Sequence, residues 1–555
     1  MAAQLPIPVI TALSEAYPDL AVATKQAARF NELVAHFESS FGDKPQFIAR
    51  APGRVNLLGE HIDYALFGVF PAAIEQDILI ACGPRKSGSD QPGSVLAHNT
   101  APKYGPQEFA PMLRVVGKGT QEVRAKQDKE VEESVSVQDW HLDIDKTQLR
   151  WESYVKAGYY GVLNHFFAKG NDHPVPVNIL VSGNVPAGSG LSSSAAMVVG
   201  STLAFLAVNK KVNEVTKGGL VEMAVENEKR VGVNSGGMDQ AASILCSPNS
   251  ALYISFYPSL SAELISIPQP PPGQEGVALV VANSLVVSDK VVGARTRYNL
   301  RVVETLSAAR VLSHKLNLGL GVKDGKNGSP PTLREVLSRY VGSEKEPLGP
   351  EQLKIALEKI LGEIDVLKSR DTKEGEEDQG VTFDELVHLS GLSREEFEKA
   401  YLSWIDVEAQ RFKLYHRAKH VFEEALRVLE FRETCLASTS QSTTSTELPT
   451  STYEKLGKLM DASHESCSKV YQCSCPELDE LVQIQREAGA YGSRQTGAGW
   501  GGCSVSLVPE SKVEEFIEKV KSRYPKYQGL EEAKLREAIF ATKPGIGAFV
   551  YQLTA

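Results

Sequence analysis

The sequence has few cysteines and no cysteine pairing pattern. Seven cysteines, an odd number, are scattered over 555 residues. None of them forms the paired CxxC spacing of a zinc site. This pattern argues against a secreted disulfide framework and favours reduced structural thiols in a cytosolic protein. Cys467, Cys473 and Cys475 form the one cluster, with His464 close by in the sequence, so a metal site there stays an alternative.

Long apolar runs are also missing. The longest helix-like apolar stretch, Ala195 to Val208, is interrupted at 200–202 by Gly-Ser-Thr and falls short of the roughly 20 residues that span a bilayer. The first twenty residues have no basic start followed by an apolar core, as a secretory signal would. We therefore expect no membrane partner and a cytoplasmic location.

Positive charge is in deficit. Lys and Arg number 59 against 69 Asp and Glu, a formal net charge of −10. Such a surface disfavours non-specific binding to nucleic acid or to anionic membranes, so we expect no nucleic-acid partner. It does not exclude an anionic ligand, because a local group of backbone N–H donors can override the mean field.

The length and the order of apolar segments indicate two domains of α+β class. A chain of 555 residues exceeds one ordinary core, and we place the division at QPPP (269–272), giving domains 1–270 and 271–555. No repeat of fixed period is present. Between 320 and 400 a charged helical region resembles an insertion, and the Ser/Thr-rich segment 438–452 is expected to be a loop. The main expected helices are 24–41, 151–167, 212–231, 297–316 and 512–522, and the main expected strands are 46–50, 73–82, 175–181, 276–287, 503–508 and 548–553.

One segment, NVPAGSGLSSSAAMVVG (184–200), combines small residues with the start of an apolar helix. Glycines let a backbone approach a ligand closely, and free N–H groups at a helix N-terminus bind anions. The alternative is an ordinary helix start, capped by Ser192 or Ser193 after a flexible turn. The segment is neither a Walker A loop nor a GxGxxG loop. The candidate nucleotide-binding residues are Gly188, Ser189, Gly190, Leu191, Ser192, Ser193 and Ser194.

Two further segments flank this loop in the sequence. APGRVNLLGEHIDY (51–64) and GSRQTGAGWGGC (492–503) resemble the galactokinase signature and the third motif of the GHMP kinases, and the loop at 184–200 resembles their second motif. The resemblance implies a two-lobed α+β fold with the active site between the N- and C-terminal domains. It further implies ATP and Mg²⁺ as cofactors, and transfer of phosphate to O1 of galactose.

The resemblance also implies roles for individual residues. Glu60, His61 and Asp63 would hold galactose hydroxyls, and Arg54 would lie near the reacting oxygen and the γ-phosphate. In NSGGMDQ (234–240) Asp239 would accept or orient the proton of the anomeric hydroxyl, with Gly236 allowing the sugar to approach the backbone. Glu228 resembles the acidic Mg²⁺ ligand, with Ser194 or a neighbour as its partner, although Glu226 lies close enough to leave that choice open.

The sugar and the biological role leave alternatives. Tyr298 matches a sugar-binding tyrosine of galactokinases, whereas the related N-acetylgalactosamine kinases, which resemble this chain over FKLYHRAKHVFEEALRVL, tend to have phenylalanine there. We therefore expect galactose. Some fungal relatives are sensors that bind galactose and ATP and sequester a transcriptional repressor, but they lack a Ser-Ala pair that GSGLSSSAA retains. Catalysis is expected, and a repressor partner stays an alternative.

Overall fold

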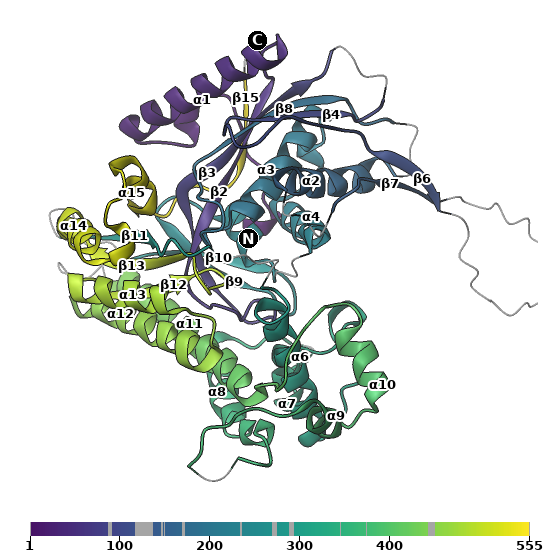
Figure 1. Cartoon of the computed structure of the whole chain (residues 1–555), viewed down its shortest axis with the longest axis vertical. Helices are drawn as coiled ribbons and strands as arrows, with labels where there is room; N and C mark the ends of the chain where they lie inside the picture. The colour runs from purple at the N-terminus through teal and green to yellow at the C-terminus, as the bar shows by residue number, and fades with distance from the viewer. Residues whose placement is uncertain are drawn as a thin grey trace, which may run out of the picture.

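The structure is a computed structural model with two sheet-containing parts and a helical region (Figure 1). It describes residues 2–86, 91–116, 137–145, 148, 150–168, 172–232, 236–268, 275–287, 293–344, 346–372, 375–441 and 450–553. The expected linker at 269–272, residues 87–90 and 117–136, and the first two residues of NSGGMDQ lie outside these ranges. Among the described residues, no helix is both long and apolar enough to cross a membrane.

A seven-stranded sheet forms the first part. Its strand order is β1-β15-β2-β3-β8-β4-β5, antiparallel except for the pairs β1·β15 and β4·β8. The strands are β1 (Val9–Ile10), β2 (Phe47–Leu58), β3 (Phe70–Pro84), β4 (Val95–Asn99), β5 (Gln107–Phe109), β8 (Val177–Gly183) and β15 (Phe549–Gln552). The last strand in the sequence thus lies inside the sheet built by the first half of the chain.

Both faces of this sheet are covered, because β3 alternates its apolar side chains. Ile78 and Ile80 belong to the main core, whereas Leu79 and Ala81 pack with the helix α1 (Leu20–Phe41), as the period of two in a strand requires. Helix α3 (Ser193–Val208) lies against β2 and β3, and every residue from Ala195 onward in it is buried. The other helices of this layer are α2 (Trp151–Phe166), α4 (Lys217–Glu228) and α5 (Met238–Leu245).

A smaller antiparallel sheet with order β12-β13-β11-β14 forms the second part. Figure 1 shows the helices of the C-terminal segment stacked beside it. The strands are β11 (Val277–Asn283), β12 (Gly492–Thr496), β13 (Cys503–Pro509) and β14 (Ile539–Thr542), and the helices are α12 (Thr450–Glu465), α13 (Pro476–Ala488), α14 (Val513–Arg523) and α15 (Glu532–Ala538). Two-stranded hairpins are formed by β6 (Met112–Val116) with β7 (Val137–His141) and by β9 (Ser250–Ser255) with β10 (Ser261–Ser266).

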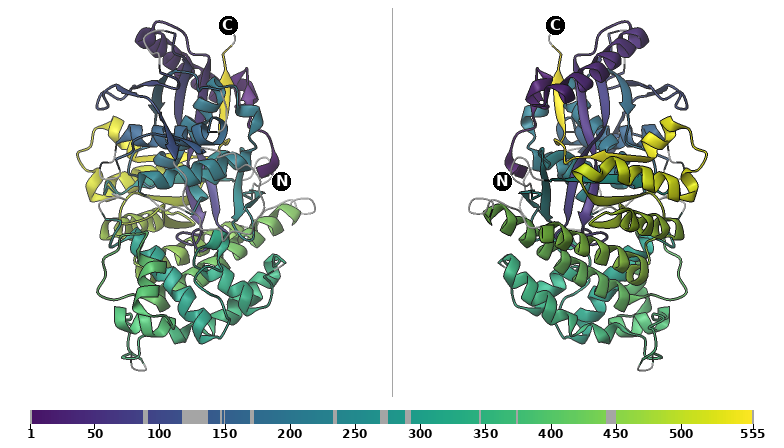
Figure 2. Two further views of the ribbon diagram at one scale, coloured as in Figure 1. Left: turned by 90° about the vertical axis from the view of Figure 1, so that its right-hand side faces the viewer. Right: turned by 90° about the vertical axis from the view of Figure 1, so that its left-hand side faces the viewer.

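The expected charged insertion is a helical region at the opposite end from the C-terminus (Figures 1 and 2). It contains α7 (Leu333–Tyr340), α8 (Pro350–Leu361), α9 (Phe383–Ser390) and α10 (Arg394–Phe397). Two long helices, α6 (Tyr298–Lys315) and α11 (Leu414–Gln441), pack on each other and connect this region to the rest of the molecule. The site described below lies where α11 meets β2, with Tyr298 at the start of α6 packed against His61.

The expected α+β class is confirmed, and most expected elements lie within a few residues of the observed ones. Two expectations were wrong in extent. The strand expected at 46–50 continues to Leu58, and residues 438–441 and 450–452 of the expected loop belong to α11 and α12. Residues 442–449 lie outside the described ranges. The division near residue 270 stays a prediction. The pairing of β15 with β2 places the last strand of the expected C-terminal domain in the first sheet.

Candidate active site

Strand β2 carries the APGRVNLL part of the first motif. Its pairing with β3 shifts register between Pro52 and Arg54 and again between Asn56 and Leu58; such bulges re-aim side chains. Beyond the strand, Gly59 has φ +99°, and a Cβ there would lie 2.9 Å from Cα of Val69, so only glycine fits. The chain therefore turns sharply into Glu60–Asp63, all of which are buried.

Arg54 joins two of the predicted functional segments. Its Nε donates to Oδ1 of Asp239 at 2.8 Å, its second terminal nitrogen lies 2.5 Å from the same oxygen, and Nη1 donates to the Gly190 carbonyl at 2.6 Å. Asp239 lies in the first turn of α5, after Gly237 with φ +109°. Both side chains are nearly buried, at 2% and 11% exposed. The guanidinium thus links a carboxylate to the loop predicted to hold phosphate.

The loop before α3 leaves the start of that helix uncapped. Gly188, Gly190 and Ser192 all have positive φ, at +69°, +78° and +60°. Ser192 occupies the N-cap position but makes no side-chain capping bond, and its buried hydroxyl has no partner among the described residues. The capped-helix alternative is therefore not what forms. The first N–H groups of α3 have no partner within the helix, and Ser193 and Ser194 are partly exposed there.

The third motif packs directly beneath this loop. A Cβ on Gly497 would lie 2.3 Å from the Gly190 carbonyl oxygen, and one on Gly502 would lie 2.7 Å from the Ser189 carbonyl oxygen. A Cβ on Gly190 would in turn lie 2.8 Å from the Thr496 carbonyl oxygen. The backbone of the third motif packs on the backbone of the loop 188–194, so the glycines at these contacts fix the shape of the loop.

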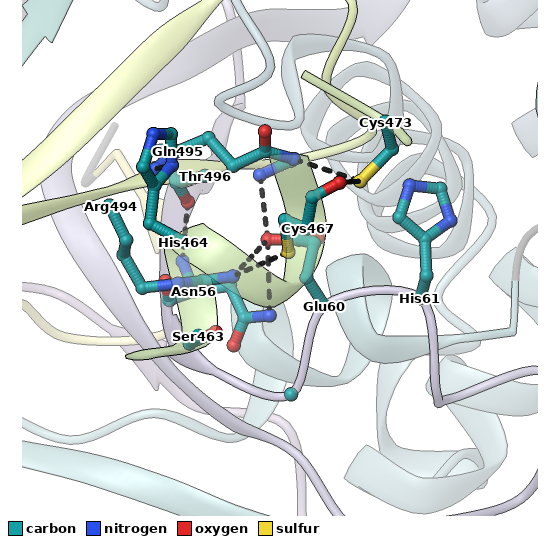
Figure 3. Close-up of polar contacts among 12 residues, drawn as sticks. Asn56, Glu60, His61, Ser463, His464, Cys467, Cys473, Arg494, Gln495 and Thr496 are labelled. Atoms are coloured by element: carbon teal, nitrogen blue, oxygen red, sulfur yellow. Dashed lines mark hydrogen bonds and ion pairs between the residues drawn. The ribbon is translucent and has the colours of Figure 1, made fainter. Parts of the chain in front are cut away.

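Glu60 is anchored through one carboxylate oxygen (Figure 3). Oε2 accepts from Asn56 Nδ2 at 3.3 Å, from Gly497 N–H at 3.1 Å and from Arg494 at 3.4 Å. Burial raises the pKa of Glu60, while the charges of Arg494 and Arg54 lower it in part. Among the described residues only Oε2 has a hydrogen-bond partner, which leaves Oε1 for a ligand.

Aromatic side chains surround His61. Its Nε2 lies 2.9 Å from the Ala498 carbonyl oxygen and must carry the proton, because a carbonyl only accepts. Its Nδ1 lies 3.1 Å from the Tyr64 hydroxyl, which itself lies 2.5 Å from the Tyr471 hydroxyl. The Tyr298 ring packs against the imidazole at 5.5 Å. A ligand hydroxyl would have to replace one of the imidazole's present partners.

Asp63, Gly236 and Tyr298 complete the cluster. A Cβ on Gly236 would lie 2.4 Å from Oδ2 of Asp63, and the same oxygen accepts the Met238 N–H at 3.4 Å. Burial, and then the charge of Asp239, raises the pKa of Asp63. The pKa of Tyr298 is raised by burial and by the charges of Asp63 and Asp239. These carboxylates and the phenol thus converge on one place.

Glu228 and Glu226 differ sharply in their surroundings. Glu228, the last residue of α4, is buried and accepts a hydrogen bond from the Gln240 side chain, next to Asp239. Glu226 is exposed and pairs with Lys229 at 2.9 Å. A buried carboxylate and a serine hydroxyl are the hard oxygen donors that Mg²⁺ prefers, with phosphates and waters completing its shell. Glu228 and Ser194 therefore carry donor groups of the type that the ion prefers.

All seven cysteines are free. Cys467 lies 3.9 Å from Arg494, and Cys473 accepts from Gln495 at 3.2 Å, both in the surroundings of Glu60 (Figure 3). In the part of the chain that the structure describes, no three His, Cys, Asp or Glu residues are arranged to hold a metal ion. The expectation of reduced structural thiols stays a prediction.

Family models match the chain in three places and in order. They are the galactokinase galactose-binding signature over residues 35–84, the GHMP kinases N terminal domain over 153–247 and the GHMP kinases C terminal over 445–526. The chain is 37% identical to a galactokinase from Dictyostelium discoideum, over 98% of each chain, and 35% identical to one from Saccharomyces cerevisiae, over 95% of each. The chain belongs to the galactokinase family.

A solved structure supports the fold of this galactokinase-family chain. It matches the structure of Lactococcus lactis galactokinase complexed with galactose with a TM-score of 0.59 and 22% identity, covering 94% of this chain and 99% of the other. The expected GHMP kinase fold is thereby confirmed.

Several residues of this galactokinase-family site escaped the sequence-based prediction. Arg494 and Thr496 lie within the third motif, where Arg494 reaches Glu60 and the Thr496 hydroxyl accepts the Asn56 N–H at 2.7 Å. Tyr64 ends the first motif and follows Glu60, His61 and Asp63. Its hydroxyl could therefore have been predicted to belong to the site. Tyr471 had no such signal, because only the folded chain brings it to Tyr64.

Proposed function

We propose that this protein transfers the γ-phosphate of ATP to O1 of α-D-galactose, forming galactose 1-phosphate and ADP. The observation that carries the proposal is the position of Arg54, which bonds both the Asp239 carboxylate and the backbone of the loop at Gly190. A cation held between a base and a phosphate loop suits phosphoryl transfer, where positioning and charge stabilisation provide most of the catalysis.

The hexose would occupy the cluster around Glu60, His61, Asp63 and Tyr298. Glu60 offers Oε1 to a sugar hydroxyl while Oε2 stays bonded to the protein. Asp63 and Tyr298 supply an acceptor and a hydroxyl. Asp63 accepts the N–H of Met238, the neighbour of Asp239, and the Tyr298 ring packs on His61. A Cβ on Gly236 would clash with Asp63, so glycine is required beside that carboxylate. Carboxylates and imidazole in fixed directions distinguish one ring of hydroxyls from another.

The nucleotide would bind at the loop 188–194. The uncapped N–H groups at the start of α3 and the positive end of its dipole face the triphosphate, with the unpartnered Ser192 hydroxyl beside them. Mg²⁺, when bound, neutralises charge on the phosphates. The Ser194 hydroxyl and the Glu228 carboxylate are the groups that would hold it.

In the reaction, the O1–phosphorus bond forms as the bond from the γ-phosphorus to the bridging oxygen of ADP breaks. Asp239 accepts the proton of the O1 hydroxyl, or orients that hydroxyl for attack on the γ-phosphorus. Arg54 stabilises the negative charge that spreads over the transferring group. The transfer therefore needs no covalent intermediate on the protein.

A coupled assay of ADP release, run with galactose, with N-acetylgalactosamine and without sugar, tests the proposal. We expect galactose to give the highest kcat/KM and the sugar-free sample to give little release. A preference for N-acetylgalactosamine would replace the substrate, and release independent of sugar would overturn the function. No observation on the described residues favours the repressor-binding alternative, and the cytoplasmic location also stays a prediction.

A further inference from the structure

Helix α11 carries a stripe of polar residues on its buried face. Arg417, His420 and Glu424 follow one another at a spacing of three and four, which places them on one side of a helix. They are 2%, 0% and 0% exposed. Buried charged and polar groups are costly unless they are hydrogen-bonded, so the partners of these three residues matter.

Glu424 holds the backbone of the turn that follows β2. Its Oε1 accepts the Gly59 N–H at 2.9 Å and the Glu60 N–H at 3.4 Å, and it also accepts the Ser463 hydroxyl at 2.6 Å. Its Oε2 accepts from Arg427 at 2.7 Å. A single carboxylate thus fixes two consecutive peptide groups of the predicted sugar-binding turn.

His420 holds the same turn through the carbonyl group of Glu60. Its Nε2 lies 3.0 Å from the Glu60 carbonyl oxygen, so that nitrogen carries the proton and donates. Its Nδ1 lies 2.8 Å from the hydroxyl of Ser466. Together, Glu424 and His420 bond the N–H and the C=O of Glu60. These groups belong to the two peptides that flank the Glu60 Cα, so both peptides have little freedom to rotate.

Arg417 holds the segment that ends at Tyr471. Its Nη1 donates to the carbonyls of Val470 and Tyr471 at 3.0 and 2.7 Å, and its Nε donates to Glu304 of α6 at 2.6 Å. Tyr471 passes this restraint on, because its hydroxyl bonds that of Tyr64 and its ring packs on His61 at 5.1 Å. The stripe therefore reaches the hexose cluster by two routes.

We propose that the stripe Arg417–His420–Glu424 positions the turn Gly59–Asp63 for hexose recognition, so that α11 sets the affinity for the sugar without touching it. The inference rests on the sugar site proposed above. The three side chains are positioning residues rather than catalytic ones, since each acts through backbone groups or through Tyr471. A role in packing alone would not require that two of them bond the two peptide groups that flank Glu60.

Two amide variants of His420 separate positioning from packing. In His420→Gln the side-chain nitrogen can reach the place of Nε2 and still donate to the Glu60 carbonyl, whereas in His420→Asn it reaches only the place of Nδ1. Loss of a buried hydrogen bond corresponds to about a tenfold change in an equilibrium constant. We expect His420→Asn to raise the KM for galactose by about tenfold, and His420→Gln to keep it much closer to that of the wild type.

The KM for ATP provides the first control, and we expect it to change less than about twofold in both variants. Val428→Ala provides the second, because Val428 lies one turn beyond Glu424 on α11, is 1% exposed and is apolar. That variant should lower the melting temperature without raising the KM for galactose. Equal galactose KM values in His420→Asn and His420→Gln would overturn the inference, as would a rise in Val428→Ala that matches the loss of stability.

Hydrogen exchange of the segment 55–64 gives a readout that does not depend on activity. We expect faster exchange there in His420→Asn than in His420→Gln, since freeing the Glu60–His61 peptide should also loosen the neighbouring N–H groups that bond Glu424. Equal exchange in the two variants would refute the positioning role. If the wild type releases no ADP with any sugar, the proposed function fails, and the exchange comparison still decides whether α11 holds the turn.

Discussion

Asp239 and Arg54 neutralise each other in a nearly buried place, which makes each dependent on its partner. Removing one member of such a pair leaves an uncompensated buried charge, so a truncation at either position would confuse a loss of chemistry with a loss of fold. An isosteric amide at position 239 avoids part of this difficulty. It keeps an oxygen that can accept from Arg54 Nε while removing the basic carboxylate.

Asp239→Asn should therefore lower kcat by about a hundredfold or more, the usual contribution of a general base. The KM for galactose should change far less, because Glu60, His61 and Asp63 are untouched. Steady-state ADP release at several galactose concentrations measures both constants, and a thermal melt checks that the variant is folded. Normal turnover in Asp239→Asn would remove this carboxylate from the mechanism.

The variant Tyr298→Phe tests whether a single hydroxyl makes the site prefer galactose to N-acetylgalactosamine. Burial and the charges of Asp63 and Asp239 raise the pKa of this hydroxyl, so it stays protonated, and it can bond a hexose hydroxyl and crowd an N-acetyl group. Its removal should lower kcat/KM for galactose and raise the ratio of N-acetylgalactosamine to galactose by about tenfold. The two sugars assayed side by side measure this ratio. If it does not move, Tyr298 has no part in sugar choice.

At the scale of elements, the phosphate loop and the third motif behave as one unit. The loop has three residues with positive φ, and the glycines below it permit contacts that no other residue allows. Backbone positions in this loop are therefore set by the C-terminal half of the chain. The shape of the nucleotide site depends on both halves being folded.

A pair of glycine variants tests this dependence. Gly497→Ala adds a Cβ 2.3 Å from the Gly190 carbonyl oxygen at φ +87°, whereas Gly529→Ala meets the same kind of backbone strain, φ +78°, with no atom within 4 Å. Both should lose stability by about 1–2 kcal/mol from the left-handed backbone. Only Gly497→Ala should also lose at least about tenfold in kcat/KM for ATP, and equal kinetics in the two variants would contradict this.

The sequence motifs predict the local parts of this site but not its supports. The loop at 184–200 has the small residues and the apolar helix that an anion site needs, and the structure places Arg54 and Asp239 against it. The length of β2 was underestimated because APGR contains proline and glycine, which weaken strand propensity, while pairing with β3 sustains the strand to Leu58.

The supports follow from tertiary contacts that no spacing encodes. His420 and Glu424 occur in KHVFEEALR, where charged residues ordinarily indicate a solvated helix face. Their partners, Glu60, Ser466 and Gly59, are distant in the sequence. Polar residues at a helix spacing of three and four beside Val421 and Phe422, which are buried, were the only signal.

For the molecule as a whole, the buried His420 should make the stability depend on pH. Burial, opposed by the charge of Glu424, lowers the pKa of His420 from 6.5 to about 4. Between these values the unfolded chain binds a proton that the folded protein does not, so stability falls as the pH falls. The contribution lost by pH 4 is about 3 kcal/mol.

Denaturant unfolding of the wild type and of His420→Gln at several pH values between 7 and 4 measures this contribution. The wild type should lose more stability than the variant across that window. Below it both should lose stability further, because the pKa of Glu424 is lowered to about 2, against the effect of burial, by the charges of Arg427 and Arg494. Parallel curves for the two proteins between pH 6.5 and 4 would contradict the assignment.

The place of β15 between β1 and β2 has a consequence for biosynthesis. The ribosome makes β15 after every other described element, so until then β2 presents an open edge that invites pairing with other chains. A messenger truncated before Phe549 would therefore yield an aggregation-prone polypeptide rather than a weakened enzyme. Chaperone protection of the nascent protein must last until translation has passed that point.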